Sequence, residues 1–181
     1  DQISRGRLDF GVGRSGFARA YEGYGIPYSE SRDRFQEALD VIIKAWGDDR
    51  LTYEGKYFSC DNLCVMPRPY QKPHPPIRIA ATTPDTFPAV GKMGYALVTG
   101  VRGFDIPEVA ENLKQYRKAW REAGHPGDGN VYLRIPIYVA ASDAEGMGDP
   151  KEGTMRSYRR MAENFANSAS SSGATASEER V

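Results

Sequence analysis

IRIAATTPDT, residues 77–86, is the stretch that decides how this chain folds. A short run rich in β-branched residues stops at Thr-Thr-Pro-Asp-Thr, which predicts a strand that feeds directly into a helix. Thr83 suits the N-cap, Pro84 the first helical position, and Asp85 the first turn, where the helix dipole favours negative charge. Free backbone N–H groups gather at this junction with three hydroxyl groups, a combination that favours anion binding. These hydroxyls belong to Thr82, Thr83 and Thr86.

A second junction of this kind lies upstream, in RLDFGVGRSG, residues 7–16. Its apolar residues alternate with small or polar ones and predict a strand, which ends in Gly13, Arg14, Ser15 and Gly16. Glycine lets a backbone approach a ligand closely, and a guanidinium fork suits phosphate. Taken singly, either junction could be a plain loop or helix cap. If both strands lie parallel in one sheet, Arg14 and the threonines meet at one edge and can bind one phosphate together.

The remaining sequence predicts an alternation of strands and helices. Apolar residues at helical spacing predict a helix from Phe35 to Trp46, capped by Ser29 or Ser31. Further helices are expected at 84–93, at 107–124 and after Pro150, the last with a core stripe of Met155, Tyr158, Met161 and Phe165. Strands are expected at 96–100 and 131–142, with two short ones around Glu54-Gly55 and Asp61-Asn62. This order predicts an α/β fold with a parallel sheet, either half of an eight-unit barrel or a small open sheet.

The segments between these elements are expected to be irregular. Glycines and Pro27 predict a loop over 16–31, a proline-rich segment predicts an extended connector into the strand at Ile77, and glycines predict a loop over 142–150. We expect one domain over residues 1–168. The low-complexity sequence of 169–181 predicts a disordered tail.

Composition is typical of a globular protein. The 181 residues carry 24 Lys and Arg against 24 Asp and Glu, a formal net charge of zero, which argues against a nucleic-acid or anionic-membrane partner. Apolar runs are too short to cross a bilayer and no secretory pattern is present, so we expect a cytoplasmic location. Cys60 and Cys64 are interpreted as packing residues rather than a disulfide or metal ligands, and no metal is expected.

Four motifs, in this order and spacing, resemble the bacterial-luciferase-like family of flavin-dependent monooxygenases. They are DQISRGRLDFGVGR, YEGYGIPYSESRDRFQEALDVIIKAW, YEGKYF and PRPYQKPHPPIRIAATTPDTF. The resemblance implies a (β/α)8 TIM barrel, of which this chain would supply about strands four to seven. It also implies that flavin phosphate is held at the ends of the fourth and fifth strands, here by Gly13, Arg14, Ser15, Thr82, Thr83 and Thr86. Ser15 stands where the family often has Gly.

The resemblance further implies a monooxygenase that uses reduced FMN and O2 to oxygenate a small organic substrate, of aldehyde, alkane or sulfonate type. A separate flavin reductase would supply the reduced FMN, and the cofactor would carry the difficult chemistry. Two alternatives stay open: hydride transfer with the deazaflavin F420 on the same fold, and a non-catalytic flavin-binding or incomplete domain. No catalytic residue is assigned, because the family's usual candidates lie on the other strands. The exposed edges of a half-barrel could pair with another chain, so a homodimer is a further expectation.

Overall fold

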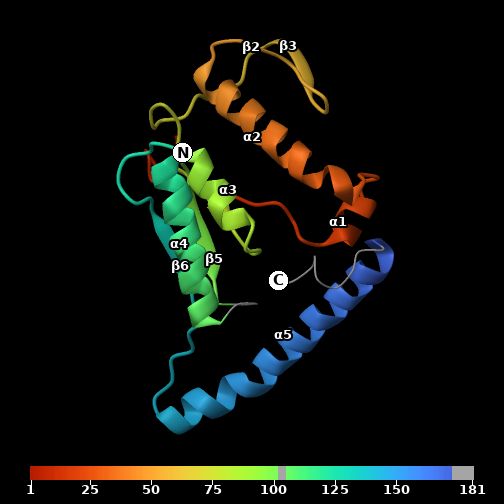
Figure 1. Cartoon of the computed structure of the whole chain (residues 1–181), viewed down its shortest axis with the longest axis vertical. Helices are drawn as coiled ribbons and strands as arrows, with labels where there is room; N and C mark the ends of the chain where they lie inside the picture. Colours follow the sequence, from red (N-terminus) through yellow and green to blue (C-terminus); the bar gives the residue numbers. More distant parts are fainter. Residues whose placement is uncertain (102–104, 173–181) are drawn as a thin grey trace.

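The computed structural model describes residues 1–101 and 105–172, the side chains of 165 and 167–172 excepted (Figure 1). Its centre is a four-stranded sheet made of β1 (Phe10–Val12), β4 (Ile77–Ala80), β5 (Ala96–Gly100) and β6 (Val131–Arg134). The strands lie in the order β1-β4-β5-β6, and every pair is parallel. The prediction of a parallel sheet built from successive strand–helix units is therefore confirmed. Within the described residues, β1 and β6 are the edge strands.

Helices cover one face of this sheet. α3 (Thr86–Met93) and α4 (Ile106–Glu122) lie side by side on it, and α2 (Ser31–Gly47) runs past its upper end in Figure 1. The predicted apolar stripes of α2 and α4 do face the core, which confirms those two helices. The buried cluster consists of Leu39, Ile77, Ile79, Ala81, Phe87, Val90, Leu97, Tyr116 and Trp120. Alternation along β4 sends Ile77 and Ile79 into this core and leaves Arg78 on the other face.

A two-stranded antiparallel hairpin extends from the end of α2. It consists of β2 (Leu51–Glu54) and β3 (Ser59–Leu63), which confirms the two short strands predicted there. The Glu37 carboxylate of α2 accepts hydrogen bonds from the backbone N–H groups of Tyr57 (2.9 Å) and Phe58 (2.8 Å). These bonds fix the hairpin to the helix.

The segment between β1 and α2 is more regular than its glycines predicted. It contains a short helix, α1 (Ala18–Glu22), and a 3-10 turn, η1 (Tyr28–Glu30). α5 (Asp143–Ser172) likewise begins well before the predicted start, with Pro150 inside it. Ser142 explains the early start, because its hydroxyl accepts a hydrogen bond from the backbone N–H of Glu145 (3.3 Å). A Ser followed three residues later by Glu is a helix-start signal that outweighs the glycines.

The strand predicted over 131–142 is much shorter, because β6 ends at Arg134. Pro136 lacks the N–H group that a ladder bond needs, so the pairing with β5 stops just before it. The side chains of Ile137 and Val139 that follow are 82% and 86% exposed.

Two predictions of burial are wrong. Cys64 is exposed and Cys60 only half-buried, so Cys64 is not a packing residue. Met155 and Tyr158 of the predicted core stripe are also exposed, because α5 runs diagonally away from the sheet and reaches α1 at its far end (Figure 1). α5 extends to Ser172, into the stretch predicted to be disordered. The rest of that stretch, 173–181, and the side chain of Phe165 lie outside the described residues.

The described part of the chain contains several helices, of which α5 is the longest. No helix there combines the length and the apolar character that crossing a bilayer requires.

Gly91 allows α3 and α4 to cross closely, and its replacement by Ala is expected to destabilise the fold. A Cβ at this position would clash with the backbone carbonyl oxygen of Tyr116. We expect Gly91→Ala to lower the free energy of unfolding by about 1–3 kcal/mol, as overpacking does. Gly47→Ala is the matched control, because a Cβ there meets nothing within 4 Å. Urea denaturation of both variants checks this, and equal stability of the two would contradict the close crossing.

Tyr116 predicts a loss of stability at alkaline pH. Burial raises the pKa of its hydroxyl to about 12, and this hydroxyl donates to the carbonyl oxygen of Tyr95 (3.0 Å). In the unfolded chain a tyrosine titrates near pH 10, so the unfolded state loses its proton first. The contribution of the Tyr116 hydroxyl to the free energy of unfolding is complete below about pH 10 and is lost as the pH rises from about 10 to 12. Urea denaturation across this range should show a shallower pH slope for Tyr116→Phe than for wild type, and equal slopes would refute it.

Candidate functional site

The two predicted junctions do lie at the same edge of the sheet. β1 pairs with β4 in parallel, with Phe10 opposite Ile77 and Val12 opposite Ile79. A Cβ placed on Gly13 would lie 3.2 Å from the Cβ of Ala80, so the residue after β1 is beside the last residue of β4. The loops that carry Arg14 and the threonines therefore leave the sheet side by side, as the sequence predicted.

Arg14 is held by a buried partner. Its Nη1 donates a hydrogen bond to the hydroxyl of Ser31 (2.9 Å), whose side chain is 3% exposed. The guanidinium carbon also lies 5.3 Å from the ring centroid of Tyr28. Ser31 was predicted as one of two helix caps, but the N-cap of α2 is Glu30, which makes no side-chain capping bond. The Ser31 hydroxyl instead orients the guanidinium.

Tyr21 lies next to this arginine and keeps its proton. Its ring is 5.4 Å from that of Tyr28. Burial raises the pKa of the Tyr21 hydroxyl, although the positive charge of Arg14 acts in the opposite direction. A neutral phenol therefore adds no negative charge to the surroundings of Arg14.

The threonine junction differs in detail from the prediction. α3 begins at Thr86 rather than at Pro84, with Asp85 as its N-cap, and Thr83 does not cap it. The Thr83 hydroxyl donates to Oδ1 of Asp85 (2.5 Å) and shares a hydrogen bond with the hydroxyl of Thr86 (2.8 Å). The acceptor that Asp85 offers explains this, because a carboxylate attracts the hydroxyl more strongly than backbone groups do.

Arg32 connects the threonine junction to the start of α2. Its Nη2 lies 2.6 Å from Oδ2 of Asp85, and both side chains are more than half exposed. Although burial acts to raise it, the hydrogen bonds from Thr83 and Arg32 hold the pKa of the Asp85 carboxyl below its ordinary value. Ser31 and Arg32, adjacent in sequence, therefore contact the two loops, one each. Sequence reasoning missed both roles, because only the three-dimensional arrangement places the first turn of α2 between the loops.

The remaining predicted residues lie at the same edge. Ser15 accepts a hydrogen bond from the backbone N–H of Phe17 (3.2 Å), where α1 begins, and its side chain is exposed. Thr82 is exposed two residues after the end of β4. The structure thus brings Gly13, Arg14, Ser15, Thr82, Thr83 and Thr86 to one edge, and their role in binding a cofactor stays a prediction.

The groups at this edge are of the chemical types that bind phosphate in proteins. Two guanidinium groups and two hydroxyls, from Arg14, Arg32, Thr83 and Thr86, carry donors suited to an anion, although Arg32 and Thr83 each donate to Asp85 in this structure. Gly13 and Gly16 add no side chain that would fill the space above the loops, and a Cβ on Gly16 would meet nothing within 4 Å. The donor set fits a phosphate ester, such as that of FMN.

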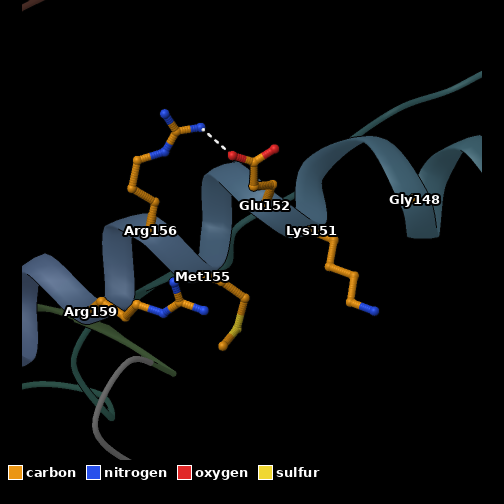
Figure 2. Close-up of a pocket in the computed structure, with 6 residues that line it drawn as sticks. All are labelled: Gly148, Lys151, Glu152, Met155, Arg156 and Arg159. Carbon is orange, nitrogen blue, oxygen red and sulfur yellow. Dashed lines mark hydrogen bonds and ion pairs between the residues drawn. The ribbon is translucent and has the colours of Figure 1, made fainter.

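A hollow elsewhere on the molecule does not compete for this assignment. It is lined by Gly148, Lys151, Glu152, Met155, Arg156 and Arg159, all from α5 and all exposed (Figure 2). Arg156 and Glu152 point to one side of the helix and pair at 3.4 Å, whereas Lys151, Met155 and Arg159 point to the other. Residues of a single exposed helix do not enclose a ligand.

Comparison with known proteins places this arrangement in a family. The sequence profile of the luciferase-like monooxygenases matches residues 1–178. The oxygenase component of the flavin-dependent trigonelline monooxygenase of Acinetobacter baylyi is 32% identical over 147 residues, 80% of this chain and 41% of that protein. The F420-dependent glucose-6-phosphate dehydrogenase of Kineococcus radiotolerans is 30% identical over 142 residues, 76% of this chain and 41% of that protein.

A solved structure shares the fold. Monooxygenase RslO1 from Streptomyces bottropensis superposes with a TM-score of 0.80 at 28% identity, over 92% of this chain and 51% of that one. The chain therefore spans about half the length of this structure, and less than half of each of the two relatives. The predicted luciferase-like barrel fold is confirmed, with the four-stranded sheet as a part of it.

Proposed function

This chain belongs to the luciferase-like monooxygenase family, and we propose that it binds reduced FMN as part of an enzyme that oxygenates a small organic substrate with O2. That enzyme is the natural polypeptide that contains these residues, the full-length protein. One observation carries the proposal. Ser31 and Arg32, at the start of α2, join Arg14 to the threonine junction and so assemble donors from two loops at one edge of the sheet.

Each group at this edge has a role in holding the flavin phosphate. The guanidinium of Arg14, oriented by Ser31, would donate to the phosphate oxygens. The hydroxyls of Thr83 and Thr86 would donate from the opposite loop, and Gly13 would let the backbone approach. Fixing the phosphate at the rim orients the rest of the flavin relative to the sheet. When bound, reduced flavin would supply the electrons that activate O2 for transfer of one oxygen atom to the substrate.

The partner we propose is a flavin reductase. One relative is named as an oxygenase component, which supports a system in which a second protein supplies the reduced flavin. The substrate class that we propose is an aldehyde, alkane or sulfonate, as the motifs of the chain imply.

A second candidate is an F420-dependent oxidoreductase of the same fold. The relative from Kineococcus radiotolerans, 30% identical, carries this cofactor in its name. F420 also contains a phosphate group, so the donors at the rim suit both cofactors. In this case hydride transfer would replace the reaction with O2.

An anaerobic titration of the full-length protein separates these functions. We expect reduced FMN to bind more tightly than F420, and the complex to consume O2 when a substrate of the proposed class is added. Tighter binding of F420 would favour the second candidate. Flavin binding without turnover of any substrate would favour a non-catalytic flavin carrier, and binding of neither cofactor would refute the assignment.

A further inference from the structure

Asp85 occupies two of the donors that a phosphate group would use. Its Oδ2 accepts from Arg32 (2.6 Å) and its Oδ1 accepts from Thr83 (2.5 Å). A phosphate group would engage these side chains in the same way, with one of its oxygens accepting from Arg32 and another from Thr83. We propose that Asp85 competes with the flavin phosphate for Arg32 and Thr83. Asp85 releases these two donors when the phosphate binds and takes them back when it leaves, so the cofactor remains exchangeable.

The two arginines of the site differ in a way that supports this exchange. Arg32 is paired with a carboxylate, and the pair is exposed, with side-chain exposures of 68% and 52%. Exposed ion pairs contribute little to stability, so Arg32 can change partner at little cost. Arg14 is bonded to the neutral hydroxyl of Ser31 instead, and no ion pair of Arg14 is found within the described part of the chain. The positive charge of Arg14 is therefore always available to an anion, whereas the positive charge of Arg32 is already paired with Asp85.

The charge of Asp85 also acts directly on a bound phosphate. A carboxylate in the same turn as two donor threonines would lie close to a doubly charged phosphate and would repel it. Asp85 is also the N-cap of α3, a position that favours Asp, but Asn caps a helix equally well and would not repel phosphate. The negative charge of Asp85 therefore lowers the affinity of the site for phosphate, which suits a flavin that has to leave and return.

Exchange is what a shared flavin requires. The inference rests on the proposed function, in which a separate reductase reduces the flavin and the oxygenase takes it up. An oxygenase that held FMN too tightly would not accept reduced flavin from its partner. Asp85 would thus set the affinity of the site low enough for transfer.

The test is a charge-neutral substitution, Asp85→Asn, in the full-length protein. Asparagine keeps the shape and the Oδ1 acceptor for Thr83 but no longer repels phosphate. We expect FMN to bind about 1.5-fold to fivefold more tightly, the range that a single exposed charge contributes, and to dissociate more slowly. Riboflavin, which lacks the phosphate, should bind as it does to wild type. Arg32→Gln should weaken FMN binding and leave riboflavin unchanged.

A matched ion pair provides the control. Arg121 and Asp128 form an exposed pair at 3.0 Å, with side-chain exposures of 59% and 65%, at the end of α4. Asp128→Asn changes the net charge by the same amount as Asp85→Asn, at a site that touches neither loop. It should leave FMN binding unchanged. An equal gain in both variants would mean that net charge alone is responsible, and would overturn the role of Asp85.

Inorganic phosphate supplies a readout that does not depend on flavin. Its binding, followed by 31P NMR, should also be tighter in Asp85→Asn than in wild type. If FMN binds wild type but Asp85→Asn binds FMN no more tightly, the competitor role is wrong and the proposed function stands. If neither protein binds FMN but Asp85→Asn binds phosphate more tightly, Asp85 competes with anions and the flavin assignment fails. Weaker phosphate binding in Asp85→Asn would show that Asp85 positions Arg32, which contradicts the inference.

Discussion

Arg14→Ala in the full-length protein is expected to weaken the binding of FMN about tenfold to hundredfold, while riboflavin binding changes little. An arginine–phosphate contact in a half-buried site is worth roughly 1.5–3 kcal/mol, which corresponds to that range of affinity. The guanidinium is already oriented by the buried hydroxyl of Ser31, so little ordering is needed when the ligand arrives. Isothermal titration of both ligands against wild type and variant measures the difference.

Two variants sharpen this prediction. Arg14→Lys keeps the charge but not the two-pronged donor, so it should recover part of the lost affinity. Ser31→Ala removes the bond that orients Arg14 and should reduce FMN affinity by a smaller factor. If Arg14→Ala weakens FMN and riboflavin equally, the arginine acts by holding its loop and not by contacting phosphate.

Phe87→Ala is expected to lower the free energy of unfolding by about 3–5 kcal/mol, the usual cost of removing a buried aromatic ring. Phe87 is fully buried, in the first turn of α3, and belongs to the core cluster between helices and sheet. A loss of this size is a large share of the stability of an average domain. Because Thr86 precedes it directly, the same substitution should loosen the threonine junction and weaken FMN binding.

Phe58→Ala is the control for this stability prediction. Phe58 lies just before β3 in the hairpin and is 39% exposed, so its loss should cost far less. Urea denaturation followed by circular dichroism compares the two variants. Equal destabilisation would mean that the core does not centre on α3, contrary to the structure.

The order of strands and helices could be predicted because each element leaves a local signal. The apolar stripe of α2, the Pro and Gly at the ends of α4 and the β-branched run of β4 all act within a few residues. The convergence of Arg14 with the threonines followed from one topological rule, that parallel strands end at the same edge. Both predictions could therefore be made from local sequence patterns and one topological rule.

The residues that complete the site could not be predicted, because their partners are far away in the chain. Arg32 and Asp85 are 53 residues apart, and Arg14 and Ser31 are 17 apart. The sequence predicted Thr83 as the helix cap with Asp85 in the first turn. In the structure the Asp85 carboxylate instead accepts hydrogen bonds from the Arg32 guanidinium and the Thr83 hydroxyl. Side-chain pairs between loops are decided by the packed structure and leave no local pattern.

The error at the start of α5 had a different cause. Gly146, Gly148 and Pro150 were given more weight than the capping pair Ser142 and Glu145, although the capping pair supplies the hydrogen bond that starts a helix. Pro150 lies inside α5 although it removes a backbone hydrogen bond and crowds the preceding turn, so it did not end the helix.

We propose that residues of two loops bind one phosphate group together. A crystal structure of the full-length protein with FMN tests this most directly. We expect phosphate oxygens within hydrogen-bonding distance of both the Arg14 guanidinium and the hydroxyl of Thr83 or Thr86, with Asp85 displaced from Arg32. FMN phosphate bound away from Arg14, or bound by Arg14 while the threonines contact nothing, would contradict it.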